Sequence, residues 1–232
     1  MCQSISDVEL GKIVFKINPR SRHIFVRLSV DGVQITLPSK RYYDDGLRLL
    51  EKSRENLLLK KKQHQTPIDE EHPLQTLTFT TRVVAVDRPQ LFFRLVDSVL
   101  TVEYPQKHEI HAPSVQSAIR KGIIYFLRQA AKRQLPPLLM QLSEKHGFKY
   151  SAIKIQESKT RWGSCSRTNS INLSLYLLLL PQHLIEYVIL HELCHTVEHN
   201  HSDRFWILLR SVAPASDLLR KELSQHHIRG IF

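Results

Sequence analysis

The chain has 232 residues, of which 42% are hydrophobic and 24% are charged. This composition is typical of an ordinary folded protein and excludes a disordered or collagen-like chain. The formal net charge is +11, and the longest strongly apolar run, Leu175 to Leu180, is too short to cross a bilayer. We therefore expect no membrane partner.

The cysteines and the N-terminus point to a reducing compartment. Three scattered cysteines, Cys2, Cys165 and Cys194, do not form the pattern of a disulfide framework. The first residues include Asp7 and Glu9 and contain no apolar segment of the kind found in signal peptides. These features predict a cytoplasmic protein.

The positive charge is concentrated in the second half of the chain. Residues 1–105 carry 16 basic and 13 acidic side chains, whereas residues 106–232 carry 17 and 9. The densest basic region runs from Arg120 to Arg133. Two interpretations stay open: a solvated surface, which we favour because no basic block is interleaved with aromatic residues, and a weak association with nucleic acid.

The first part of the chain is predicted to form β-strands and one helix. Polar and apolar residues alternate in Lys12 to Asn18, His23 to Val30 and Val33 to Leu37, and Asp31-Gly32 between the last two is a strong hairpin signal. Tyr42 to Gln63 has leucines at helical spacing. The basic triplet of this helix, Lys60-Lys61-Lys62, suits a helix C-terminus.

Three further segments are rich in β-branched and aromatic residues: Thr76 to Val86, Leu91 to Leu95 and Ser98 to Val102. We expect them to form a β-meander that continues the first sheet. The region of residues 1–108 is therefore predicted to be a β-rich N-terminal domain.

The region of residues 109–232 is predicted to combine helices with a small sheet. A helix beginning near Pro113 should break or kink at Pro136-Pro137, and a second helix should then run from Leu138 to His146. Gly147 supplies a stop. Strands are expected at Phe148 to Gln156 and Ser170 to Leu175, and helices after Pro181, Ser202 and Ala215. The predicted fold class of the whole chain is α+β.

The helix after Pro181 contains the pattern H-E-x-x-H at His191, Glu192 and His195. On a helix, residues four apart lie about 40° apart around the axis and about 6 Å apart along it, so both imidazoles can bind one Zn²⁺ ion. Glu192 lies beside this pair and can act as the catalytic base toward a zinc-activated water without binding the metal. A histidine-rich amphipathic helix that binds no metal would not explain why Glu192 and the two histidines lie together on one side of the helix.

His201 is the leading candidate for the third metal ligand. A continuous helix would carry it to the wrong face, so the chain must turn near His199-Asn200, and Asn200 tolerates the left-handed conformation that such a turn needs. The alternative third ligands are His199, Glu198 and Glu222.

The spacing of the three histidines is also that of the metzincins, H-E-x-x-H-x-x-G-x-x-H. Two features exclude this class. Glu198 occupies the position of the glycine, and a downstream methionine turn is impossible because the two methionines are Met1 and Met140.

The motif and its surroundings resemble the YgjP-like (SprT-like) metallopeptidases. The resemblance covers about residues 110–212 and rests on these segments: Arg161-Trp162-Gly163-Ser164-Cys165-Ser166, Ile171-Asn172-Leu173, His191 to His195, Asn200-His201-Ser202 and Phe205-Trp206. It implies a minimal zincin domain, with His191, His195 and His201 as zinc ligands and Glu192 as general base. The same spacing occurs in the Wss1-like proteases, which act on DNA-bound proteins.

These features predict a zinc metallopeptidase whose partner is a protein or peptide substrate. We expect the strand from Ile171 to Leu175 to offer an edge onto which an extended substrate adds. Arg161 either contacts the substrate or pairs with a carboxylate, and we favour the second. Trp162 should pack beneath the motif helix. Cys165 and Cys194 should be small buried residues rather than ligands.

Two other functions stay open on the sequence alone. One is a zinc hydrolase that uses the same residues on non-peptide amides. The other is a nucleic-acid-binding module whose zinc ion is structural.

Overall fold

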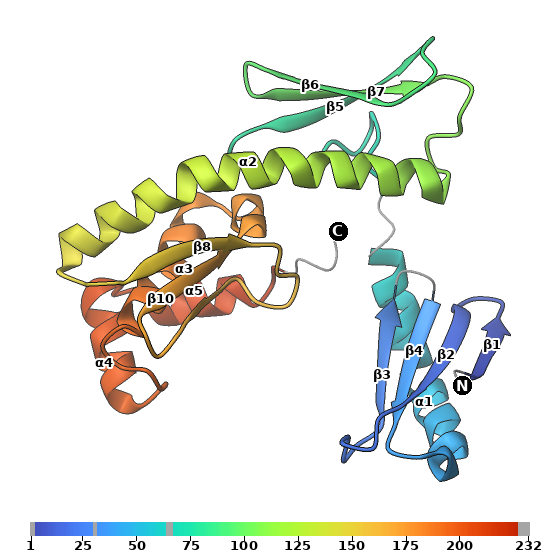
Figure 1. Cartoon of the computed structure of the whole chain (residues 1–232), viewed down its shortest axis with the longest axis horizontal. Helices are drawn as coiled ribbons and strands as arrows, with labels where there is room; N and C mark the ends of the chain where they lie inside the picture. Colours follow the sequence, from blue (N-terminus) through green and yellow to red (C-terminus); the bar gives the residue numbers. More distant parts are fainter. Residues whose placement is uncertain (1–2, 30–31, 64–66, 227–232) are drawn as a thin grey trace. The chain divides into compact units, whose positions relative to one another are not determined.

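The computed structural model describes residues 3–29, 32–63 and 67–226, and Figure 1 traces the chain. The chain divides into two compact units, residues 1–66 and 67–230. Helices and small mixed sheets make up both units, so the predicted α+β class is confirmed. No helix within the described ranges is long and apolar enough to span a membrane.

The first unit is a four-stranded sheet with one long helix. Its elements are β1 (Gln3–Asp7), β2 (Gly11–Ile17), β3 (Phe25–Ser29), β4 (Gly32–Leu37), the short 3-10 helix η1 (Lys40–Tyr42) and α1 (Tyr43–Gln63). The strand order is β1-β2-β4-β3, with β2 parallel to β4 and the outer pairs antiparallel. The hairpin predicted on either side of Asp31-Gly32 is present as the β3–β4 pair, although Asp31 itself lies outside the described residues.

One face of this sheet packs against α1. Alternation along β2 and β4 directs Ile13, Phe15 and Ile35 toward the helix, where each is at most 3% exposed. Leu50 and Leu57 of α1 complete this core. The strand β1 was not predicted, because its residues are mostly polar and only Ile5 carries a large apolar side chain.

The second unit is built on a long central helix with a small sheet on either side (Figure 1). Its elements are β5 (Thr80–Val86), β6 (Phe92–Val96), β7 (Val99–Pro105), α2 (Pro113–His146), β8 (Ala152–Gln156), β9 (Gly163–Cys165), β10 (Ser170–Ser174), the 3-10 helix η2 (Leu175–Leu179), α3 (Gln182–Cys194), α4 (Asp203–Val212) and α5 (Ser216–Leu223).

The prediction that β5, β6 and β7 continue the first sheet is wrong. They form a separate sheet of order β5-β7-β6, in which β5 runs parallel to β7. Phe79, Val83 and Leu100 are buried in the same core as α2, so this sheet belongs to the second unit. The division of the chain consequently falls after residue 66 and not at the predicted boundary between residues 108 and 109.

The helix α2 is continuous through Pro136 and Pro137, so the predicted break, with a second helix from Leu138, is wrong. Every fourth residue along one face is fully buried, in the order Ile119, Ile123, Leu127, Ala131, Leu135, Leu139. Each large apolar side chain on this face contributes about 1.5–3 kcal/mol when buried, and together they exceed the cost of about 3 kcal/mol for each of the two internal prolines. The helix ends, as predicted, at Gly147, whose φ of 72° is left-handed.

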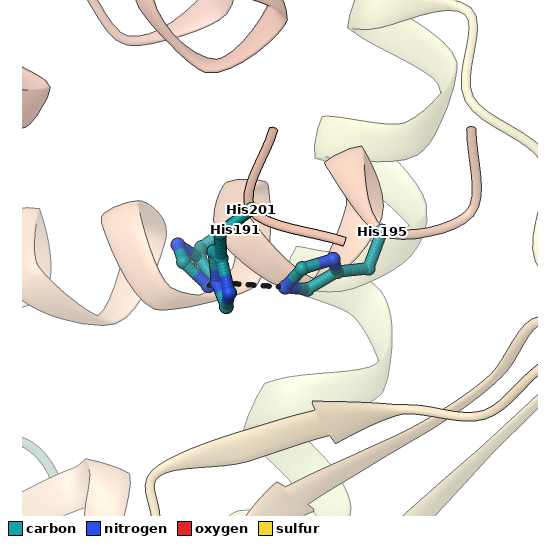
Figure 2. A group of neighbouring side chains, drawn as sticks. All are labelled: His191, His195 and His201. Carbon is teal, nitrogen blue, oxygen red and sulfur yellow. Dashed lines mark hydrogen bonds between the residues drawn. The ribbon is translucent and has the colours of Figure 1, made fainter. Parts of the chain in front are cut away.

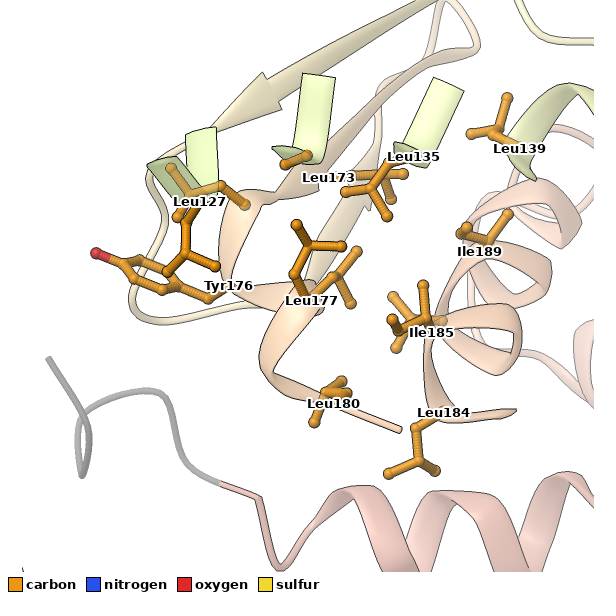
Figure 3. Close-up of a cluster of buried hydrophobic side chains, with 14 of the residues drawn as sticks. Leu127, Leu135, Leu139, Leu173, Tyr176, Leu177, Leu180, Leu184, Ile185 and Ile189 are labelled. Carbon is orange, nitrogen blue, oxygen red and sulfur yellow. The ribbon is translucent and has the colours of Figure 1, made fainter. Parts of the chain in front are cut away.

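The third sheet carries the strands next to the motif helix. Its order is β8-β10-β9, so β10 is central and cannot offer the substrate edge predicted for it. The short strand β9, which was not predicted, pairs antiparallel with β10 and forms one edge of the described sheet, with β8 at the other. Beneath this sheet, Leu173 of β10, Leu177 of η2 and Ile185 of α3 meet the buried face of α2 (Figure 3).

Candidate metal and catalytic site

The motif helix α3 is anchored on its apolar face. Leu184, Ile185 and Ile189 are fully buried in the main core. The helix begins directly after Pro181, as predicted, and this proline is the N-cap residue, which accounts for the lack of a side-chain cap. This packing fixes the position of the helix and, with it, of His191 and His195, whose ring centroids lie 4.9 Å apart.

The turn that follows α3 begins earlier than predicted. The helix ends at Cys194, and His195 keeps a helical backbone as the C-cap residue. The amide of Val197 and the amide of Glu198 both donate to the carbonyl oxygen of Cys194 and close a last helical turn after α3. Asn200 is absent from the described residues with positive φ, so the predicted left-handed turn at this residue is wrong.

The next helix, α4, starts at Asp203 with Ser202 as its N-cap residue, where a cap was predicted. The Ser202 side chain makes no capping hydrogen bond in the described structure. The turn and α4 together return His201 toward α3. The three predicted ligands therefore reach one place from α3, from its C-cap residue and from the segment between α3 and α4 (Figure 2).

The nitrogen atoms of the three histidines converge at a spacing that suits zinc. The Nε2 atom of His201 lies 3.0 Å from that of His191 and 3.2 Å from that of His195. Three nitrogens bound to one tetrahedral zinc at about 2.0–2.1 Å would be separated by about 3.3 Å. In the described part of the chain, this trio is the group of possible ligands whose donor atoms lie within 4.8 Å of one another.

The surroundings keep two of these imidazoles neutral, as metal ligands must be. Burial, followed by the neighbouring histidines, lowers the pKa of His191 from 6.5 to about 3. Burial also lowers the pKa of His195. The Nδ1 atom of His195 lies 3.0 Å from the carbonyl oxygen of Glu198. A proton held there leaves the Nε2 lone pair directed at the cluster.

Glu192 is a buried carboxyl group beside the cluster. It is 6% exposed, and burial raises its pKa to about 7, while the positive charge of Arg161 opposes this rise. Its Oε2 atom is buried and has no hydrogen-bond partner in the described structure. A carboxyl group in this state is suited to exchanging a proton with a molecule next to it.

Gly163 of β9 lies directly against Glu192. A Cβ atom added at this glycine would lie 2.7 Å from both Cγ and Oε1 of Glu192, closer than side chains allow. The glycine therefore lets the edge strand approach the carboxyl group. Trp162 packs against the main core, as predicted, whereas none of the described ion pairs contains Arg161, against the pairing that we favoured.

Aromatic rings fix the ligand imidazoles, a feature that the sequence analysis missed. Phe205 stacks on His195, with centroids 4.4 Å apart and an interplanar angle of 25°. Trp206 stacks on His201 at 5.6 Å and 27°. The guanidinium of Arg220 in α5 lies 5.0 Å from the centroid of the Trp206 ring on α4. The adjacent aromatic pair just after the third histidine was the available signal.

The other predicted candidates lie outside the histidine cluster. Glu222 is 2.8 Å from His183 and is thus engaged elsewhere. Glu198 contributes its backbone carbonyl to His195. Cys194 is fully buried and Cys165 is half-buried, and burial raises the pKa of their thiols to about 12 and about 11.

Comparison with known proteins assigns the class of this chain. Residues 22–226 match the family described as YgjP-like, metallopeptidase domain. The protein is thus a metallopeptidase, a metal-dependent hydrolase of peptide bonds for which zinc is the typical metal. The chain belongs to the YgjP-like family, which confirms the resemblance inferred from its motifs.

Two solved structures are similar to part of the chain. They are the metallopeptidase zymogens of Pyrococcus abyssi abylysin and Methanocaldococcus jannaschii jannalysin, with 22% and 25% sequence identity. Each match covers 38% of this chain and 90% or 92% of the other, with TM-scores of 0.36 and 0.35. Comparison with curated proteins finds no match.

Proposed function

We propose that this protein hydrolyses peptide bonds with one zinc ion held by His191, His195 and His201. The observation that carries the proposal is the convergence of the three Nε2 atoms, 3.0 and 3.2 Å from one another, beside a buried carboxyl group. When bound, zinc would lower the pKa of a water molecule and polarise the scissile carbonyl group.

Glu192 serves as the general base in this proposal. Its buried Oε2 atom accepts the proton of the attacking water and then delivers it to the leaving amine. A pKa raised by burial suits both steps, because the group must take up and release a proton near neutral pH. Arg161, whose charge acts on this carboxyl group, favours its ionised form between turnovers.

An extended peptide is the substrate that suits the neighbouring sheet. The strand β9 is one of the two edges of the described sheet, the other being β8, and Gly163 of β9 lies close against Glu192. A peptide that adds to this edge as a further strand would bring its backbone carbonyl groups to the base and the histidines. Main-chain pairing of this kind accepts many sequences, which favours an unstructured protein or peptide as the partner.

The test combines zinc content and proteolysis for two variants. We expect Glu192→Gln to retain wild-type zinc and to lose hydrolysis of an unstructured protein by about 10²- to 10⁴-fold. His201→Ala should lose zinc as well as activity. Undiminished zinc in His201→Ala would refute the three-histidine site, and hydrolysis of small amides but not of peptides would assign the site to another reaction.

A further inference from the structure

The sheet of the first unit has one face that α1 does not cover. Strand pairing places Ser4, Ser6, Lys12, Val14, Lys16, Phe25, Arg27, Gln34 and Thr36 on this open face, opposite the residues that pack on the helix. Their pairing is in register: Lys16, Thr36 and Phe25 form one row across three strands, and Val14, Gln34 and Arg27 form the next.

The charges of this open sheet face are all positive. Lys12, Lys16 and Arg27 are exposed, and the face contains neither Asp nor Glu among the residues that the structure describes. None of the ion pairs given for the described residues includes these three cations. The acidic groups of the unit gather instead around α1, where Arg54 binds Asp7 and Glu51.

An exposed aromatic ring lies among these cations. The Phe25 side chain is 40% exposed on this face and is not part of the core of the first unit. The Arg27 guanidinium lies 5.5 Å from its ring centroid, and the His23 ring meets it edge-on at 6.4 Å. Two strand spacings separate Lys16 from Phe25, about 10 Å, so one chain can contact both.

We propose that this open sheet face binds single-stranded nucleic acid, with Lys12, Lys16 and Arg27 on the phosphates and a base stacked on Phe25. A phosphate backbone supplies the complement to three cations without an acid, and unstacked bases supply the flat partner for an exposed ring. In a duplex the bases are already stacked and paired, so the ring would have no partner there.

The other basic surface of the chain is less suited to this role. On α2, Arg128 forms an ion pair with Glu157, and burial lowers the pKa of Arg120. No exposed aromatic residue is in cation–π contact with an α2 cation among the described residues. The proposal lies outside the peptidase site and does not depend on it.

The test measures binding of the full-length protein to labelled oligouridine and oligothymidine of about 20 nucleotides, with a duplex of equal length alongside. The variant Lys12→Gln/Lys16→Gln/Arg27→Gln should weaken binding and reduce the slope of log K against log salt by about 2, since each single-strand phosphate contact contributes about 0.7. Phe25→Leu, which keeps the charge, should weaken single-strand binding by roughly tenfold. The two oligonucleotides distinguish RNA from DNA.

The matched control is Lys121→Gln/Lys132→Gln/Arg133→Gln, which removes the same charge from exposed positions of α2. It should keep the wild-type salt slope. The proposal is overturned if wild type binds neither oligonucleotide, if only the α2 variant loses binding, or if Phe25→Leu has no effect and duplex binds equally well. Circular dichroism and hydrogen exchange in residues 11–17 and 32–37 check that the first unit is folded, and single substitutions replace the triple variant if it does not fold.

Discussion

At the scale of single residues, the geometry of the site depends on the residues that contact the metal ligands and the general base as much as on the ligands and the base themselves. The motif spacing identified the three histidines and Glu192, because residues four apart on a helix share a face. The spacing could not identify Gly163, which is 29 positions earlier in the sequence and reaches Glu192 through the strand pairing of β9 with β10. Contacts of this kind are set by the fold and leave no local pattern.

Gly163→Ala should reduce peptidase activity without removing the metal. The added Cβ atom would lie 2.7 Å from the Glu192 carboxyl group, and the buried side chain must shift to accommodate it. A displacement of about 1 Å from the productive position costs about 10²-fold in rate. The measurement is kcat together with zinc content. A variant with wild-type kcat would show that Glu192 does not act from the position seen in the structure.

Trp206→Leu should weaken zinc binding. Its indole stacks on His201 at 5.6 Å, and the Arg220 guanidinium lies 5.0 Å from the centroid of the same indole ring, so the ring limits the rotation of a ligand imidazole. Loss of a group that orients a ligand typically lowers metal affinity by about 10- to 100-fold.

The measurement for Trp206 is competition with a chromophoric zinc chelator. Trp206→Phe retains a ring and should recover much of the affinity, whereas Ile207→Ala, at a 63% exposed neighbouring position, should leave it unchanged. Equal zinc affinity in wild type and Trp206→Leu would assign the tryptophan a purely structural role.

At the scale of elements, tertiary packing decides the places where the sequence misled us. Pro136-Pro137 is a strong local helix-breaking signal, yet the buried stripe of α2 continues on both sides of it, at Leu135 and Leu139. The hairpin β6–β7 was predictable from its strands, but the sheet to which it belongs was not, because that depends on the contact of Val83 and Leu100 with α2. Local propensity predicts elements better than it predicts their partners.

Gly122→Ala tests the contact between α2 and the β5–β7 sheet. A Cβ atom at Gly122 would lie 2.1 Å from the ring of Phe93 in β6. Alanine favours a helix by about 1 kcal/mol over glycine, whereas overpacking costs about 1–3 kcal/mol, so we expect a net destabilisation of about 1 kcal/mol. Chemical unfolding measures this change in the free energy of unfolding.

The Gly122→Ala prediction can be tested more specifically in a second protein, the Phe93→Ala variant. In Phe93→Ala the ring is gone, and Gly122→Ala should then be stabilising, because only the helix preference is left. The same sign in both backgrounds would mean that the close approach of the two residues does not determine stability.

At the scale of the whole molecule, the chain has two cores, one for each compact unit. All residues of the candidate metal site lie in the second unit, so zinc binding should stabilise that unit by mass action. The stability of the first unit depends instead on a group of ion pairs. In it, Arg54 of α1 pairs with Asp7, the last residue of β1, and with Glu9 in the turn between β1 and β2.

The first unit should lose stability in acid through Asp7. The Arg54 side chain, and then the backbone amide of Leu10, lower the pKa of Asp7 from 3.8 to about 2. A carboxyl group with a depressed pKa in the folded state stabilises that state above its unfolded pKa, and the contribution is lost as the pH falls through the folded pKa. The stability advantage of wild type over Asp7→Asn should therefore be constant above about pH 5 and shrink between about pH 4 and 2.

Urea unfolding read by pulsed hydrogen exchange in residues 11–17 and 32–37 follows β2 and β4 and thus reports this unit separately. Tryptophan fluorescence would not report the unfolding of the first unit, because Trp162 and Trp206 both lie in the second unit. Arg54→Met should abolish most of the pH dependence of the difference, since it removes the largest cause of the lowered pKa. A difference between wild type and Asp7→Asn that persists unchanged to pH 2 would show that the Asp7–Arg54 ion pair is not what joins α1 to the first strands.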